Sequence, residues 1–230
     1  MSYLDEPSDL DLLNILLAEI SRRLKSGLVA EIVGLLKTAL EGLENIDDPL
    51  ILLDISTKIL HIVSSIGTRG RDIAYKVIEL VKKRIDSSDE KLKYPYAKFL
   101  AYASEVLYGI GDNPLELLNE ADKILYDLAI EKKFVKEYAS FIRLFYAPIL
   151  KLLGYQKKAL KSLEVAEDEL YYYYKKTNEK GALYLLGELF AYRAEILYES
   201  NDICLLYTSD AADDGESVDL GGRRMIKKKK

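Results

Sequence analysis

Four glycines recur along this chain at a nearly constant spacing, and this spacing limits the fold more than any other feature. They are Gly27, Gly67, Gly111 and Gly154, separated by 40, 44 and 43 residues. Each ends one run of apolar residues and stands before the next, where glycine supplies the left-handed backbone conformation that other residues resist. A period of this size, with two helices per unit, is typical of helical repeat proteins, in which neighbouring helix pairs share a core.

The runs between these glycines have a helical period in residues 1–203, where no alternating strand pattern occurs. The first run places its apolar residues three and four positions apart, on one face of a helix: Leu10, Leu13, Leu17, Ile20 and Leu24. Asp48-Pro49 starts another helix that extends to Gly67. We also expect helices over 95–110, over 135–152 with a bend at Pro148, and over 183–198.

These patterns predict an all-α fold, specifically a right-handed α-solenoid of about four to five antiparallel helix pairs. The alternative is an irregular helical bundle in which the glycine spacing arises by chance.

One unit resembles a known family. Residues 154–166 read GYQKKALKSLEVA and resemble the turn and second helix of a tetratricopeptide repeat, with small Ala159 and Ala166 on either side of Leu163. Residues 191–198, AYRAEILY, are similar to a first helix of that family. The resemblance covers roughly a third of the chain, and the other units are longer than the family's usual 34 residues. It implies a groove lined by the first helix of each pair, which holds a peptide.

The composition changes abruptly after residue 203. Residues 204–230 contain the only cysteine, Cys204, the only methionine besides Met1, and the run Lys227–Lys230. Residues 204–215 and the lysine run resemble the conceptual translation of a sequencing adapter followed by a poly-A stretch. We therefore expect a helical-repeat domain over 1–203, truncated at its C-terminal end, and a non-native or disordered tail over 204–230. The alternative is a basic tail that contacts nucleic acid or an anionic membrane.

The charge of the chain argues against nucleic acid as the partner. The whole chain has a net charge of −5, and residues 204–230 contribute five acids and six bases, so residues 1–203 have a net charge of −6. Proteins that bind duplex DNA usually concentrate lysine and arginine on one face. The N-terminus lacks the pattern of a signal peptide, and lysine or arginine interrupts the most apolar stretches. We expect a cytoplasmic protein with no membrane partner, and the scarcity of Cys, Gln, Trp and Met favours a hot environment.

The side chains needed for catalysis are scarce. His61 is the only histidine, and residues 1–203 contain no cysteine, whereas zinc sites need several such ligands. No nucleophile motif accompanies His61. We predict a non-enzyme with no metal and no cofactor. The run Tyr171–Tyr174 precedes Lys175-Lys176, but four consecutive helical residues point in four directions and cannot form one base-stacking platform.

Counting back from each turn identifies equivalent positions on the first helix of each pair. Three residues before the turn lie Ser64, Tyr108, Lys151 and Tyr198. Six residues before it lie His61, Glu105, Pro148 and Glu195. Thirteen residues before it lie Asp54, Lys98, Phe141 and Glu188. From these positions we predict a partner-binding surface of Lys98, Glu105, Tyr108, Lys151, Glu188, Glu195 and Tyr198. The alternative is that these side chains simply face solvent.

The sequence therefore favours a non-catalytic scaffold that binds a peptide or protein segment in a helical-repeat groove. The alternative is a regulatory or nucleic-acid-associated module of a larger protein. A continuous basic stripe would favour this alternative, and its candidate members are Lys82, Lys83, Arg84, Lys132, Lys133, Lys136, Lys157 and Lys158. We also expect self-association through the C-terminal repeat, because a truncated array exposes an apolar end.

Overall fold

The computed structural model describes residues 8–200, and this part of the chain is all-helical, with no strand. The predicted tail over 204–230 lies outside the described residues. The first three helix pairs consist of α1 (Asp9–Lys25), α2 (Val29–Glu44), α3 (Pro49–Ile66), α4 (Arg71–Arg84), α5 (Glu90–Gly109) and α6 (Leu115–Ile130). A short 3-10 turn, η1 (Gly67–Gly70), joins α3 to α4.

The next part of the chain is less regular. α7 (Val135–Phe141), the π-helical turn η2 (Ile142–Tyr146) and α8 (Ala147–Leu152) follow one another without a break. We call them together the α7–α8 segment. Two long helices follow, α9 (Gln156–Thr177) and α10 (Lys180–Glu199).

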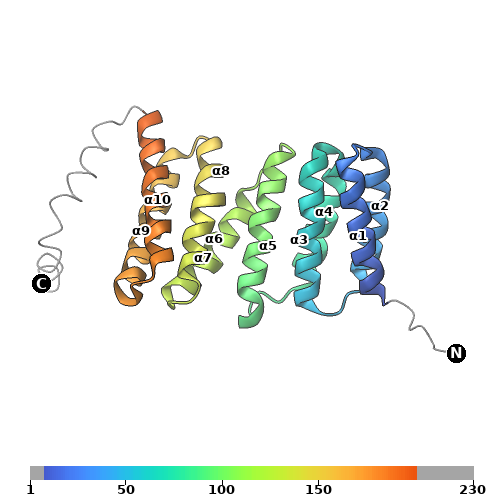
Figure 1. The fold of residues 1–230 in the computed structure, drawn as a ribbon, viewed down its shortest axis with the longest axis horizontal. Coiled ribbons are helices and arrows are strands. Elements are labelled where there is room, and N and C mark those ends of the chain that lie inside the picture. The colour runs from blue at the N-terminus through green and yellow to red at the C-terminus, as the bar shows by residue number, and fades with distance from the viewer. Residues whose placement is uncertain (1–7, 201–230) are drawn as a thin grey trace, which may run out of the picture.

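The helices form two rows. In the view of Figure 1, α1, α3, α5, the α7–α8 segment and α10 lie side by side in chain order. We call these helices the front row, and α2, α4, α6 and α9, which pack behind them, the rear row. Each front helix up to the α7–α8 segment contacts the rear helix that follows it in the chain, and neighbouring front helices also touch. Segments close in sequence are therefore close in space along the whole row.

The four turn glycines adopt the predicted backbone conformation. Their φ angles are +74° at Gly27, +61° at Gly67, +83° at Gly111 and +84° at Gly154. An added Cβ would meet no atom within 4 Å at any of them. Backbone conformation, and not crowding, therefore explains glycine at these turns.

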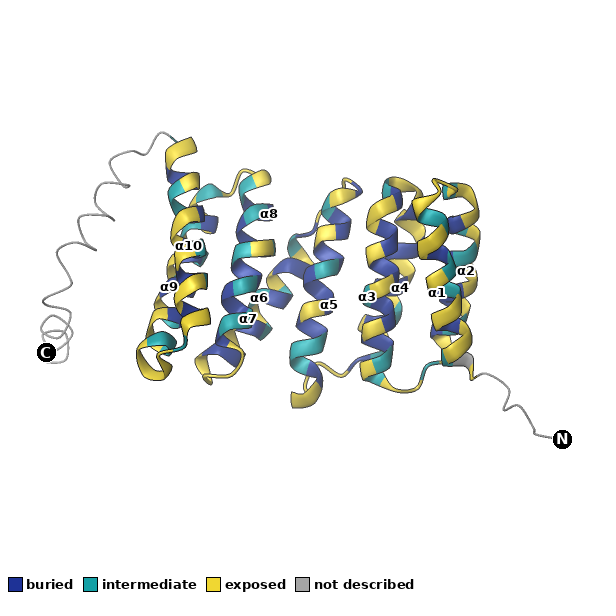
Figure 2. Cartoon of the chain, in the orientation of Figure 1, coloured by how far each residue is buried: buried dark blue, intermediate teal, exposed yellow. Residues whose placement is uncertain are grey.

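One continuous core runs along the row. Figure 2 shows buried residues as strips along the helices, with exposed residues on the outward sides. Leu36, Leu60, Leu100 and Leu118 are fully buried, from four different helices. The small side chains at the helix contacts are also fully buried and allow close approach; they include Ala97, Ala103, Ala121 and Ala159.

Two predicted helix starts are wrong. α5 begins at Glu90 and not at Pro95, because the Asp89 carboxylate caps it by accepting a hydrogen bond from the Lys91 amide (2.9 Å). Pro95 lies inside this helix and has no N–H to donate to it, which costs stability, but the burial of Leu92 in the added turn more than offsets this cost. α10 begins at Lys180 and not at residue 183, two residues after the left-handed Asn178 that caps α9 (φ +53°).

The irregularity predicted at Pro148 lies in the turn before it. Pro148 has no N–H to bond the carbonyl oxygen four residues earlier, and its ring crowds that oxygen. The helix widens into the π-helical turn η2 over residues 142–146 and then continues as α8. This turn shifts the register of the side chains that precede it.

One helical stretch of the described residues, Pro49–Arg84, is long and apolar enough to cross a membrane by length and composition. Its most apolar window of 18 residues has a mean hydropathy of 1.5, and 50% of that window is buried inside the structure. A core helix of a soluble protein has the same composition, and the stretch here includes two helices of the row.

Candidate interaction surface

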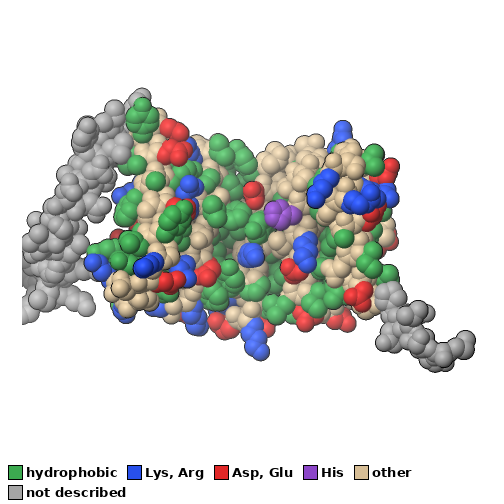
Figure 3. All heavy atoms as spheres, in the orientation of Figure 1, with side chains coloured by type: hydrophobic (Ala, Val, Ile, Leu, Met, Phe, Trp, Pro, Cys, Tyr) green, Lys and Arg blue, Asp and Glu red, His purple; other side chains and the backbone are tan. Residues whose placement is uncertain are grey.

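The outward side of the front row, from α3 to α10, carries all seven predicted partner-binding residues. We call it the front face. Figure 3 shows hydrophobic side chains gathered over the α7–α8 segment, with charged side chains of both signs around them. Leu144 and Leu152 of this segment are each 63% exposed. Leucines this exposed, eight residues apart on one segment, are candidates for contact with a partner.

Rings from neighbouring helices contact one another across the front face. The His61 ring on α3 lies 5.3 Å from the Tyr102 ring on α5, and the Tyr102 ring lies 5.2 Å edge-on from the Phe145 ring in η2. On α10, the Tyr192 ring lies 4.3 Å from the Arg143 guanidinium carbon. We call His61, Tyr102, Phe145 and Tyr192 the aromatic ladder.

The ladder is partly accessible. His61 is exposed, Tyr102 and Phe145 are half-buried, and Tyr192 is buried. Edge-to-face ring contacts of this kind hold the rings in fixed orientations. The front face therefore presents ordered ring edges next to the exposed leucines of the α7–α8 segment.

Lys151 joins two front helices through ion pairs. Its Nζ lies 2.8 Å from Glu199 and 3.2 Å from Glu195, both on α10. The pKa of Lys151 is raised, mainly by its hydrogen bond with Glu199 and to a lesser extent by that with Glu195. Partial burial of Lys151 acts in the opposite direction and lowers the pKa. The structure thus brings together two of the predicted site residues, Lys151 and Glu195.

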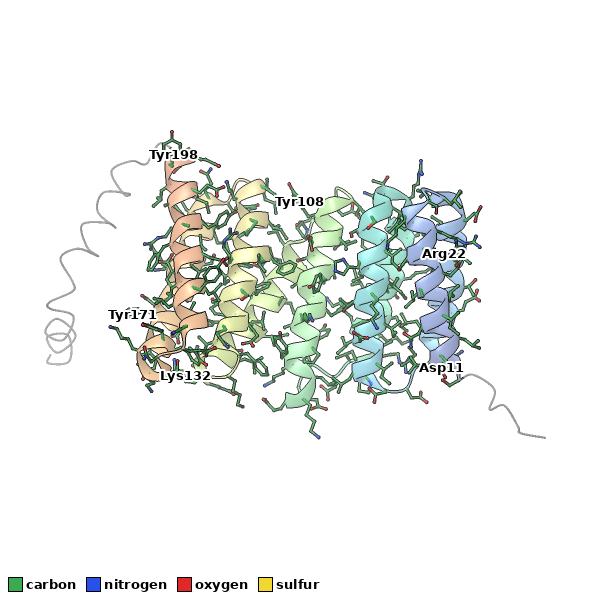
Figure 4. The ribbon with its side chains drawn as sticks, viewed as in Figure 1. Asp11, Arg22, Tyr108, Lys132, Tyr171 and Tyr198 are labelled. Atoms are coloured by element: carbon green, nitrogen blue, oxygen red, sulfur yellow. The ribbon has the colours of Figure 1, made fainter. Side chains whose placement is uncertain are left out.

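The other predicted residues are spread along the face. Lys98 and Glu105 are exposed on α5, on either side of Tyr102, and Glu188 is half-buried on α10. Tyr108 and Tyr198 lie along the same edge of the array, near the C-terminal ends of α5 and α10 (Figure 4). The α7–α8 segment separates these two tyrosines, so the structure does not bring them together.

Counting back from the turns missed the aromatic ladder. Tyr102 and Phe145 each lie nine residues before a turn glycine, Gly111 and Gly154, and Tyr192 lies nine residues before Asn201, where the sequence predicts a further turn. The recurrence of an aromatic residue at this position was a usable signal. Thirteen residues before the turn, Phe141 is buried, unlike exposed Lys98, because the π-helical turn shifts the register of α7.

A shallow groove lies at the N-terminal end of the front face, between α1 and α3. It has a volume of about 500 Å³, and its lining residues include Leu17, Ser21, Lys58 and His61. His61 belongs to both the groove and the aromatic ladder. The groove therefore extends the front face toward α1.

The basic residues of the hypothesised stripe are largely paired with acids. Five of the eight form ion pairs: Lys82 with Glu116 and Glu120, Arg84 with Asp47, Lys132 with Glu169, Lys133 with Glu90 and Glu131, and Lys136 with Glu179. Neighbouring carboxylates thus neutralise much of the charge that a phosphate backbone would need.

The tyrosine run near the end of α9 does not form a stacking platform. Tyr171 and Tyr172 are 39% and 40% exposed, whereas Tyr173 and Tyr174 are half-buried. The Tyr173 hydroxyl donates a hydrogen bond to Glu179 (2.8 Å). These rings point in different directions, as the sequence predicted.

Comparison with known proteins adds no relative. No family model, curated protein or solved structure matches the chain. The resemblance to tetratricopeptide repeats therefore stays a prediction from the residues quoted above.

A buried ion pair fixes the end of the front row. Arg193 on α10 lies 2.8 Å from Glu167 on α9, whose side chain is 6% exposed. The Arg193 side chain is 19% exposed. This pair links the last front helix to the rear row.

A largely buried carboxyl, Asp122, lies on α6. Burial raises its pKa to about 6, and Lys158 and the Tyr146 hydroxyl partly offset this effect. The same hydroxyl lies 3.1 Å from Asn119 Oδ1, which also accepts a hydrogen bond from Lys158 (2.9 Å). Within residues 8–200 no group of three metal-ligating side chains occurs. Tyr146 and Lys158 thus connect α6 to η2 and α9, and this cluster holds the helices together.

Proposed function

We propose that this chain is a non-catalytic scaffold that binds a peptide or protein segment along the front face. In this proposal the two rows of helices form a right-handed, tetratricopeptide-like α-solenoid. The aromatic ladder is the observation that supports it most, because ring contacts connect α3, α5 and η2, and Tyr192 on α10 contacts Arg143 of η2.

The chemistry of the face indicates the kind of segment that would bind. Exposed Leu144 and Leu152 offer apolar contacts, and half-buried Tyr102 and Phe145 offer ring edges. Contacts of this type dominate the binding energy of protein interfaces, whereas charged rims mainly set orientation. The rim here has both signs, with Lys98 and Glu105 exposed on α5. We therefore expect a segment with one or two large apolar side chains flanked by charges of both signs.

Selection from a displayed library of random peptides tests the proposal. We expect selected peptides that contain an aromatic or large aliphatic anchor. Leu144→Glu on the front face should weaken their binding by about tenfold or more, because it places a charge in the apolar contact. Tyr102→Ala should do the same by removing a ladder ring.

Ile130→Glu is the matched control. Ile130 is 49% exposed at the end of α6, in the rear row, so this variant should bind the peptides as the natural chain does. Equal binding by all three variants would overturn the proposal. Failure to select any peptide would do so as well.

A further inference from the structure

One side of α10 carries a row of exposed apolar residues. Leu183, Phe190 and Tyr198 are 51%, 38% and 71% exposed, and Gly187 and Ala191 are exposed too. Together with half-buried Ala194, these residues follow one another at spacings of one, three and four along one side of the helix. We call these six residues the α10 stripe.

The same positions are covered in α5. Gly187, Phe190, Ala191 and Ala194 correspond to Ala97, Leu100, Ala101 and Ser104 of α5, each 90 residues earlier in the chain. Those four α5 residues are 0–3% exposed, and α5 packs against α6. The face of α5 to which the α10 stripe corresponds is therefore covered by neighbouring helices.

The α10 stripe has the same order of large and small residues from either end. Leu183 and Tyr198 are large and lie at the two ends, Gly187 and Ala194 are small and lie inside them, and Phe190 and Ala191 lie at the centre. In two antiparallel copies of α10, Phe190 would meet Ala191 of the second copy. Gly187 would meet Ala194 of the second copy. Phe190 thus faces a small residue at the centre, the small pair Gly187 and Ala194 allows the two helices to approach closely, and Leu183 meets Tyr198 at each end.

We propose that the α10 stripe binds a second copy of this chain, with the two α10 helices antiparallel about a two-fold axis near residues 190 and 191. Such an interface is isologous, since each copy contributes the same residues. A single helix pair buries little surface, so the dimer should be weak, with a Kd on the order of micromolar or weaker. This surface shares Tyr198 with the predicted partner-binding residues and no residue with the aromatic ladder.

One edge of the α10 stripe is acidic and makes the dimer sensitive to salt. Glu188, Glu195 and Glu199 lie along this edge, and Lys151 pairs with the last two. Antiparallel packing about a two-fold axis brings the two acidic edges together. Because dissolved salt screens this repulsion, the dimer should tighten as ionic strength rises.

Sedimentation equilibrium of the full chain tests the proposal. We expect a mass that rises with protein concentration from one chain to two. Ala191→Glu should weaken the dimer by about tenfold or more, because two carboxylates then meet at the two-fold axis. The matched control is Ala30→Glu, at an exposed alanine of α2, and it should leave the dimer unchanged. A single-chain mass at every concentration, or equal effects of the two substitutions, would overturn the proposal.

Cysteine cross-linking tests the antiparallel arrangement in chains that also carry Cys204→Ser. A mixture of Gly187→Cys and Ala194→Cys chains should form a mixed disulfide dimer. An added Cβ at Gly187 meets no atom within 4 Å, so this cysteine fits on α10. Cross-linking of Ala194→Cys mainly to itself would indicate parallel helices and overturn the two-fold arrangement. No cross-link in either sample would also overturn it.

Discussion

At the scale of single residues, two glycines two positions apart illustrate how the backbone determines residue choice. Gly111 has a φ of +83°, whereas Gly109 is the last helical residue of α5, and an added Cβ at either one meets open space. The two positions thus differ in backbone conformation and not in crowding.

Replacing each glycine with alanine should have opposite effects on stability. Gly111→Ala should lower the free energy of unfolding by about 1 kcal/mol, because alanine is strained at positive φ. Gly109→Ala should raise it by about 0.5–1 kcal/mol, because alanine favours a helix. Urea unfolding of both variants checks this, and a change of the same sign in both would contradict the account of the turns.

Asp122 should make stability depend on pH. Its pKa is about 6 in the folded chain, above its ordinary value of 3.8, because burial disfavours the charged form. A raised pKa means that the folded state binds the proton more tightly. Its contribution to stability is therefore fully present below about pH 4 and is lost as pH rises through about 6.

Asp122→Asn should remove this loss. We expect the free energy of unfolding at pH 8 to rise by about 1–2 kcal/mol, with little change at pH 3.5, because the natural residue is then protonated. Chemical unfolding at the two pH values is the measurement. Asp127→Asn, at an exposed position on the same helix, is the control and should show no such difference. A gain that is equal at both pH values would contradict the proposed cause.

At the scale of elements, the ion pair between α9 and α10 holds the end of the array. Arg193→Met removes a partner from the buried Glu167 carboxylate. We expect it to lower the free energy of unfolding by about 2–4 kcal/mol. Arg22→Met also breaks an arginine–glutamate pair, with Glu19, but the Arg22 side chain is 70% exposed, and its loss should matter far less. Thermal unfolding of both variants distinguishes these cases, and equal losses would contradict a structural role for the buried pair.

Capping and turn residues made part of the helix pattern predictable. Asp48-Pro49 marked the start of α3, and the four glycines marked turns, because these residue types have few alternative uses. The start of α5 and the π-helical turn were not predictable in this way. They depend on how Leu92 packs and on how the helix accommodates Pro148, which are properties of the folded chain.

At the scale of the whole molecule, the candidate surface was only partly predictable. The sequence placed Lys98, Glu105 and Lys151 on the front row, but it missed the contacts between Tyr102 and its neighbours. Those contacts depend on the angle by which one helix pair is rotated relative to the next. This angle cannot be predicted from the helical period of the sequence alone.

The composition of the chain makes a separate prediction about thermal stability. Residues 1–203 contain no cysteine, one glutamine and only the initiator methionine, and they are rich in charged side chains, which is typical of proteins from hot environments. We expect a Tm above the range of about 45–65 °C that is usual for mesophile domains. Circular dichroism during heating measures it, and a Tm within that range would count against this origin.

The central claim, that the front face binds a protein segment, is tested most directly by NMR of the full chain with a selected peptide. Chemical-shift changes should concentrate on Tyr102, Leu144 and Phe145 and extend toward His61 or Tyr192. Changes confined to the rear row, or to the α10 stripe alone, would contradict the claim.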